Sequence, residues 1–163
     1  MKIDIERILA LKKEIKVAAY MHYKTDLLPK GALKTPEDAQ PVWNAMKEIF
    51  PTLKISEYYV DSINHDLIAK GSELTRLYEE CKKGKYDIIV FPNMWSLRYT
   101  AIDVIAEVRK FTKLEHPPIL YFFLEDIDST ASDFFENLTM MICGLEIIGR
   151  YRKRKRQFNL YLK

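Results

Sequence analysis

The sequence has 163 residues, of which 48% are hydrophobic and 30% charged, and these values are typical of a single folded globular domain. They exclude an intrinsically disordered chain, and the longest apolar runs, such as Ile119 to Leu124, are too short to cross a bilayer. The first residues lack the apolar core of a signal peptide, and two cysteines are too few for a disulfide framework, so we expect reduced cysteines and a cytoplasmic location.

The predicted elements alternate between helices and strands. Residues 1–14 carry apolar side chains at helical spacing, which predicts an amphipathic helix docked against the domain or a partner. Continuous apolar runs then predict buried strands at 15–21, 53–60, 86–91 and 119–124, and amphipathic segments predict helices at 36–49, 71–83 and 99–113. This alternation predicts an α/β fold over residues 15–149, with a doubly wound, mostly parallel sheet of four to five strands.

A long C-terminal helix is predicted from about residue 131 to 149. Its apolar residues repeat at spacings of four and three, which is the pattern of a heptad seam, and they are Phe134, Leu138, Met141, Leu145 and Ile148. Further apolar residues widen this face beyond what one surface helix needs. We therefore expect the helix to form a homodimer, and the alternative is a central helix buried within one domain.

The charge of +3 is unevenly distributed along the chain. Residues 150–163 contain seven basic residues and no acidic one, which leaves 19 of the 26 basic residues against 23 acidic residues elsewhere. An acidic body with a basic tail predicts a local contact with a polyanion. We expect six of these seven residues to make the contact: Arg150, Arg152, Lys153, Arg154, Lys155 and Arg156.

Several segments match the order and spacing of a known family. They are Glu79 to Val90 (EECKKGKYDIIV), Glu125 to Ser129 (EDIDS), and Leu145-Glu146 before the basic stretch. On these segments, and over roughly residues 15–156, the chain resembles the catalytic domain of serine site-specific recombinases, the resolvase/invertase family. The resemblance implies a resolvase-like sheet with a dimerisation helix and a link to DNA recombination or mobile elements.

The family's catalytic motif is altered in this sequence. The family has Tyr-x-Arg-Val-Ser-Thr after the first strand, whereas this chain has Tyr20, His22 at the arginine position, Lys24 at the serine position, and Thr25. The resemblance further implies that Asp61 and Arg98 match family positions, while Lys70 and Trp95 stand where arginines are expected.

The resemblance therefore implies a degenerate site. In the family the serine attacks a DNA phosphodiester, and several arginines stabilise the transition state without a metal. A lysine amine cannot form the phosphoserine bond, and Thr25 follows Lys24 directly, so in a strand it would point to the opposite face. We expect that the chain does not cleave DNA.

The remaining positive charges suggest weak, nonspecific DNA binding. Lys24, His22, Lys70 and Arg98 would form a cationic phosphate pocket, or they are the result of drift after catalysis was lost. The basic tail would follow the DNA as the family's long helix does, or it only aids solubility. The family's separate DNA-recognition domain would follow this tail, but the sequence ends at Lys163, so we do not expect sequence-specific binding.

Two other functions stay open. A doubly wound sheet binds ligands at the carboxyl ends of its strands, so Lys24, Asp61, Asn93 and Arg98 would suit a phosphorylated small molecule or a nucleotide. The third possible function is that of a purely structural dimer module. Separately, the chain could form a mixed dimer with an active recombinase instead of a homodimer. The three histidines show no ligand spacing and no glycine loop is present, so we expect neither a metal nor a cofactor.

Overall fold

A computed structural model describes residues 14–24, 40–49, 51, 53–63, 72–97 and 101–144. The described chain contains one five-stranded sheet in the order β2-β1-β3-β4-β5. The strands are β1 (Val17–Lys24), β2 (Ile55–Ile63), β3 (Ile88–Phe91), β4 (Ile119–Phe122) and β5 (Ile127–Asp128). The first four are parallel and β5 pairs antiparallel to β4, which confirms the predicted mostly parallel α/β sheet.

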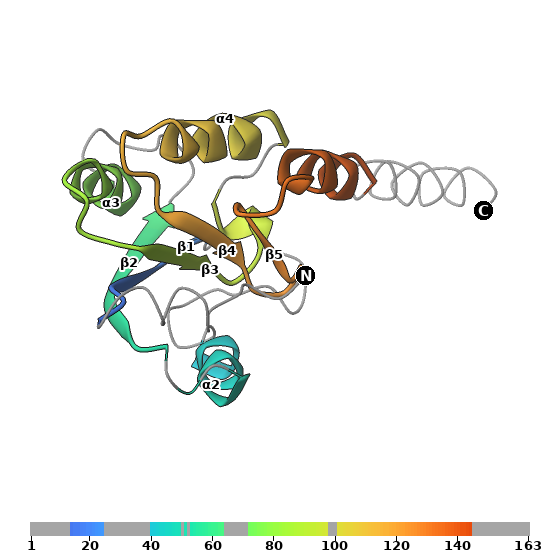
Figure 1. The fold of residues 1–163 in the computed structure, drawn as a ribbon. Coiled ribbons are helices and arrows are strands. Elements are labelled where there is room, and N and C mark those ends of the chain that lie inside the picture. The colour runs from blue at the N-terminus through green and yellow to red at the C-terminus, as the bar shows by residue number, and fades with distance from the viewer. Residues whose placement is uncertain are drawn as a thin grey trace, which may run out of the picture.

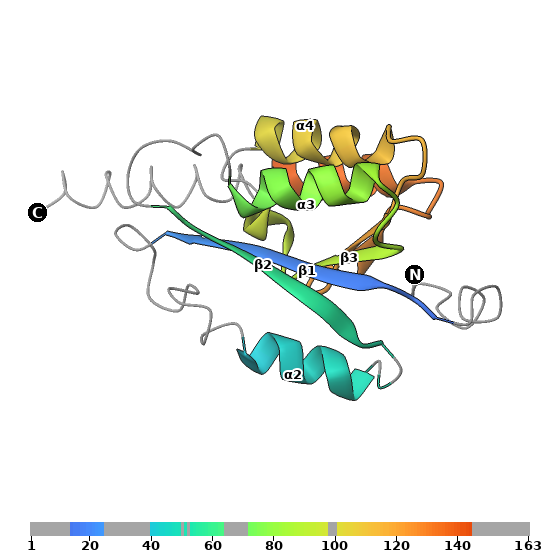
Figure 2. The same cartoon turned by 90° about the vertical axis from the view of Figure 1, so that its left-hand side faces the viewer.

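Helices cover both faces of the sheet. The labelled ones are α2 (Gln40–Ile49), α3 (Glu73–Lys82) and α4 (Ala101–Thr112), and residues 134–144 are also helical. Figures 1 and 2 show α2 on one face and α3, α4 and the 134–144 helix on the other. The strands β3 and β4 are therefore buried on two sides, which explains their continuous apolar sequences, whereas the edge strand β2 leaves Tyr58 43% exposed.

Alternation along β1 divides the core into two halves. Ala18 and Tyr20 belong to the cluster beneath α3 and α4, whereas Val17, Ala19 and Met21 belong to the cluster that contains Trp43 and Met46 of α2. All seven side chains are at most 4% exposed. Burial of this extent on both faces supplies the main favourable contribution to folding.

Some strands end at other residues than the sequence predicts, because local contacts determine where they end. β1 continues to Lys24 because it pairs with β2 as far as Ile63. β4 ends at Phe122 because a turn follows, in which Asp126 adopts a positive φ of 51°. The two-residue strand β5 and the 3-10 helix η2 (Met94–Ser96) were not expected, since both are too short to produce a periodic pattern.

Two smaller expectations concern a glycine and the cysteines. Gly84 comes directly after the helix predicted at 71–83, where a terminating glycine is expected, and in the structure it follows the end of α3 with a φ of 68°, which confirms this expectation. Cys81 is buried in the core, and burial raises the pKa of its thiol to about 12. Both cysteines are free thiols, as expected, but only Cys81 packs in the core, whereas Cys143 is exposed. Its position on the outer side of the 134–144 helix explains the difference.

The predicted dimer seam is divided by the structure. Phe134 and Leu138 are 2% and 0% exposed in the domain's own core, where the ring of Phe134 stacks on Phe122. The third buried position is Ile142, at the same four-residue step, while Met141 is 37% exposed. Leu145 and Ile148 lie outside the described residues, so the length of the helix and its role in dimerisation stay predictions.

Candidate functional site

The candidate site lies where the direction of the crossovers reverses. The chain passes from β1 to β2 on one side and then to β3 on the other side of β1, so β1 and β3 form the switch point of the doubly wound sheet. Loops leaving the carboxyl ends of two such strands diverge, and the space between them is where open α/β sheets bind ligands. His22 lies near this end of β1, and Asn93 and η2 follow β3.

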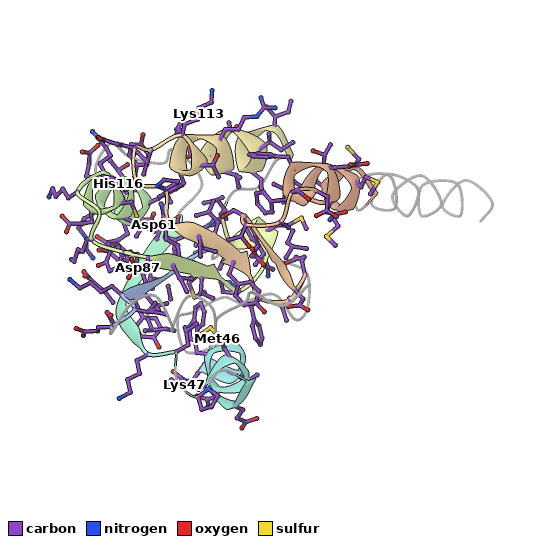
Figure 3. The ribbon with its side chains drawn as sticks, viewed as in Figure 1. Met46, Lys47, Asp61, Asp87, Lys113 and His116 are labelled. Carbon is purple, nitrogen blue, oxygen red and sulfur yellow. The ribbon has the colours of Figure 1, made fainter. Side chains whose placement is uncertain are left out.

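Asp61 joins β2 to the start of α3. Its Oδ1 accepts a hydrogen bond from the backbone N–H of Glu73 at 2.8 Å, and its Oδ2 accepts from the N–H of Leu74 at 3.0 Å. The hydroxyl of Tyr20 donates to the same Oδ2 at 3.0 Å. Figure 3 shows Asp61 at the end of β2 beneath α3. The carboxylate thus satisfies helix N–H groups that lack a partner and lies at the positive end of the helix dipole.

His22 joins β1 to the loop after β3. Its Nδ1 lies 2.7 Å from the carbonyl oxygen of Ser96, and the side chain is 8% exposed. Because a carbonyl only accepts, Nδ1 must carry the proton in this contact, and Nε2 then holds the lone pair of the neutral ring. His22, which the sequence resemblance places at an arginine position of the family motif, is thus a buried side chain that binds backbone.

Two further side chains hold η2. Asn93 caps it, because its Oδ1 accepts from the N–H of Ser96 at 2.8 Å and from the Ser96 hydroxyl at 3.1 Å. The carboxylate of Glu125, which follows β4, accepts from the N–H of Met94 at 3.3 Å. Burial raises the pKa of this carboxyl group. Glu125 was quoted in the sequence only as part of a family segment, and a carboxylate soon after a buried strand was the signal for a site role.

The structure brings together only part of the predicted site. Tyr20 and Asp61 are hydrogen-bonded, and His22 is the register partner of Asp61 across β1 and β2. Lys24 is the last residue of β1, opposite Ile63, and Trp95 lies in η2. The remaining predicted residues lie outside the described residues: Thr25, Lys70, Arg98 and the basic residues Arg150, Arg152, Lys153, Arg154, Lys155 and Arg156.

Other kinds of site receive little support from the described residues. Within these ranges no group of three or more His, Cys, Asp or Glu side chains is arranged to hold a metal ion. A small cavity of about 130 Å³ lies between the β4–β5 turn and the 134–144 helix, lined in part by Asp126, Asp128 and Phe134. Among the described helices, none is both long and apolar enough to cross a membrane.

Two solved structures resemble this arrangement closely enough to identify the fold. A resolvase-family site-specific recombinase from Streptococcus pneumoniae matches with a TM-score of 0.59, covering 90% of this chain and 95% of its own, at 19% identity. The N-terminal catalytic domain of the TP901-1 integrase matches with a TM-score of 0.58, covering 85% and 97%, at 18% identity. The chain has a resolvase-like fold. No family model and no curated protein matches the sequence.

The fold similarity and the side-chain contacts establish different things about this chain. The sequence resemblance and the structural similarity both point to the same fold, and the structural match covers 90% of the chain. At 18–19% identity the similarity establishes the architecture, whereas the roles of individual side chains depend on the contacts described above. In this resolvase-like domain, His22, Asp61, Asn93 and Glu125 all hold backbone groups around the switch point.

Proposed function

We propose that this chain is a recombinase-like protein that binds duplex DNA without cleaving it and is linked to DNA recombination or mobile elements. The supporting observation is the resolvase-like fold, which extends over 90% of the chain in one comparison. One neighbour is a site-specific recombinase and the other is the catalytic domain of an integrase. DNA is therefore the substrate class that the architecture favours.

The absence of cleavage follows from the chemistry of Lys24. This residue ends β1 and stands at the serine position implied by the motif. A lysine amine has a reference pKa of about 10.4, so near neutral pH it is a cation and a poor nucleophile. It also cannot form the serine phosphodiester that stores the energy of the broken strand for rejoining.

The cationic positions of the motif favour retained phosphate contacts. Lys24, Lys70 and Arg98 keep a positive charge where the family binds the scissile phosphate, and the alternative is drift after catalysis was lost. A phosphate contact contributes to affinity through counterion release. Lys24→Glu should therefore weaken DNA binding by about tenfold at low salt. Lys113→Glu, at an exposed position beyond α4, is the matched control, and equal affinities for the two variants would eliminate the pocket.

The basic tail supplies the main electrostatic contact in this proposal. Five consecutive basic residues, 152–156, exceed what stabilisation of a helix C-terminus requires. Such a cluster binds phosphates without reading bases, so the expected binding is weak and nonspecific.

A dimer is the expected binding unit. Phe135, Met140 and Met141 expose apolar surface on the 134–144 helix, with exposed fractions of 39%, 60% and 37%. Met140 and Met141 are consecutive in the sequence, and exposed apolar side chains of this size favour a protein contact. A homodimer, or a mixed dimer with an active recombinase, would cover them.

A phosphorylated small molecule or nucleotide is the second candidate ligand. The switch point between β1 and β3 supports it, because open α/β sheets bind such ligands there. Thermal stabilisation by a nucleotide, in a protein without DNA affinity, would favour this function. If neither DNA nor a nucleotide binds, the structural dimer module is the function that the result would favour.

The test of the proposed function combines binding with a search for cleavage. The full chain is incubated with a labelled duplex of random sequence at low salt, and binding is followed by fluorescence anisotropy. The sample is then denatured and examined for nicked DNA and for DNA attached covalently to protein. The proposal expects micromolar binding with neither product. A covalent product would show retained catalysis, and the absence of binding would overturn the DNA function.

A further inference from the structure

The segment around η2 is held by side chains from three different strand ends. His22 comes from β1, Asn93 lies two residues after β3, and Glu125 follows β4. They bind the Ser96 carbonyl, the Ser96 N–H and the Met94 N–H, respectively. A three-residue 3-10 helix has little internal hydrogen bonding, so these external contacts determine its conformation.

The contact of His22 has a specific chemical consequence. Its Nδ1–H is used by the Ser96 carbonyl at 2.7 Å, in a side chain that is 8% exposed. Both the neutral Nδ1–H tautomer and the doubly protonated ring can donate this bond, so the contact holds in either protonation state. The nitrogen used here is therefore committed to backbone and not to a phosphate.

We propose that His22 is a positioning residue, which fixes η2 at the switch point between β1 and β3 and does not itself bind phosphate. This inference refines the site of the proposed function and rests on that function only for its DNA measurement. It reassigns one of the four positions expected to form the cationic pocket. The arginine position of the motif has become a structural connection between β1 and the loop after β3.

The first measurement is the tautomer of His22. The chain has three histidines, so nuclear magnetic resonance with isotope-labelled histidine separates their ring nitrogens, and His22→Asn identifies the signal that disappears. The proposal expects the proton on Nδ1 in the neutral ring. A neutral ring with its only proton on Nε2 would place the lone pair of Nδ1 against the Ser96 carbonyl and would overturn the proposal.

The second measurement is amide hydrogen exchange around η2. His22→Leu removes the donor, whereas His22→Asn keeps an N–H group at the place of Nδ1. We expect His22→Leu to accelerate exchange of the Ser96 and Leu97 amides by about tenfold, and His22→Asn to restore most of the protection. The buried amide of Ile89 in β3 is the reference for global unfolding. Equal acceleration at Ile89, or none at Ser96 and Leu97, would contradict a local positioning role.

The third measurement separates this proposal from the proposed function. If the full chain binds DNA, His22→Asn should leave the DNA affinity and its salt dependence unchanged. If His22 instead contacts a phosphate, His22→Asn removes that contact and should lower the DNA affinity by about tenfold. Such a loss in His22→Asn would overturn the positioning role while DNA binding stands. A chain without DNA affinity would overturn the proposed function alone, because the tautomer and exchange measurements still decide the role of His22.

Discussion

Glu57 on the edge strand β2 joins three other side chains. Its carboxylate accepts from Arg76 at 2.6 Å, Lys85 at 2.9 Å and Tyr86 at 2.5 Å. The hydrogen bond from Tyr86, followed by those from Arg76 and Lys85, lowers the pKa of Glu57 to about 2. A carboxyl group with a lowered folded pKa stabilises the fold above its unfolded pKa, and this contribution is lost as the pH falls toward the folded value.

The first prediction concerns this carboxylate. Glu57→Gln should lower the free energy of unfolding by about 1 kcal/mol at pH 7, since the ion pairs are partly exposed and are screened by water. The difference in the free energy of unfolding between the variant and the parent protein should shrink as the pH falls from about 4.5 to 2. Denaturant titrations across this range measure it, and Glu79→Gln, which removes a pair with Lys82 on the surface, is the control. A difference that does not vary with pH would contradict the assignment.

The second prediction concerns Asp126 in the turn after β4. Its φ of 51° lies in the left-handed region, and its side chain accepts from the Tyr121 hydroxyl at 3.0 Å. Aspartate and asparagine tolerate this conformation, but a β-branched residue does not. Asp126→Val should therefore cost about 2 kcal/mol of stability, and Asp126→Asn less than about 0.5 kcal/mol. Thermal unfolding compares the two, and similar losses would contradict the argument.

The sequence allowed some residues of the candidate site to be named, but it did not predict which groups they bind. Tyr20 and Asp61 were both named as site residues because the resemblance implies that they match family positions, and the structure joins them by a hydrogen bond. The contact of His22 with a backbone carbonyl could not be predicted, because it depends on a loop conformation that no periodic pattern reports. The roles of Asn93 and Glu125 around η2 were missed for the same reason.

At the scale of elements, α3 is capped from two sides. Ser72 is its N-cap and accepts from the N–H of Thr75, while Asp61 of β2 accepts from the N–H groups of Glu73 and Leu74. This second cap also fixes the helix against the sheet. The element therefore depends on a residue that lies outside it in the sequence.

The third prediction compares the two caps. Asp61→Ala leaves two N–H groups and the Tyr20 hydroxyl without their acceptor and should cost about 2–3 kcal/mol, whereas Ser72→Ala should cost about 1 kcal/mol. Chemical denaturation of both variants measures this. Tyr20→Phe in the Asp61→Ala background should add little further loss, since the shared hydrogen bond is already absent. Independent, additive losses would show that the two residues do not act together.

The fourth prediction concerns the 134–144 helix. Leu138 is fully buried against the sheet, so Leu138→Ala should cost about 2–5 kcal/mol. Met140 and Met141 are exposed, so Met140→Lys with Met141→Lys should leave the stability of the domain almost unchanged and lower the tendency to dimerise. Sedimentation measures the oligomeric state, with Lys110→Glu on α4 as a surface control. An unchanged dimer in the double variant would exclude this face as the interface.

Element types were predictable because burial on both faces leaves a strong pattern. β3 and β4 each present apolar residues without interruption, and α3 presents Leu74, Leu77 and Cys81 on one face. The register of the last helix was not predictable in the same way. A heptad interpretation selected Met141, but packing on a single sheet favours steps of four and buries Ile142.

At the scale of the whole molecule, the chain has a resolvase-like fold, and the described side chains of its candidate site bind backbone groups. Parallel pairing could be expected from the alternation of helices and strands, since right-handed crossovers leave few arrangements, but the strand order was not predicted. The ligand could not be deduced in this way, because the same fold serves different functions. The charge on residues 150–156 is the sequence feature that, together with the fold, supports the proposal of DNA binding.

The most direct test of the central claim is a salt series of DNA binding by the full chain. Fluorescence anisotropy with a random-sequence duplex gives the affinity at each salt concentration, and each phosphate contact contributes about 0.9 to the slope. The comparison is a variant with four tail residues changed to glutamine: Arg152, Lys153, Arg154 and Lys155. A matched control changes four exposed lysines of the domain in the same way: Lys47, Lys54, Lys82 and Lys113.

The account predicts micromolar, steeply salt-dependent binding by the parent and the control, and a loss of both affinity and slope in the tail variant. An absence of binding at low salt, or equal binding by all three proteins, would contradict it.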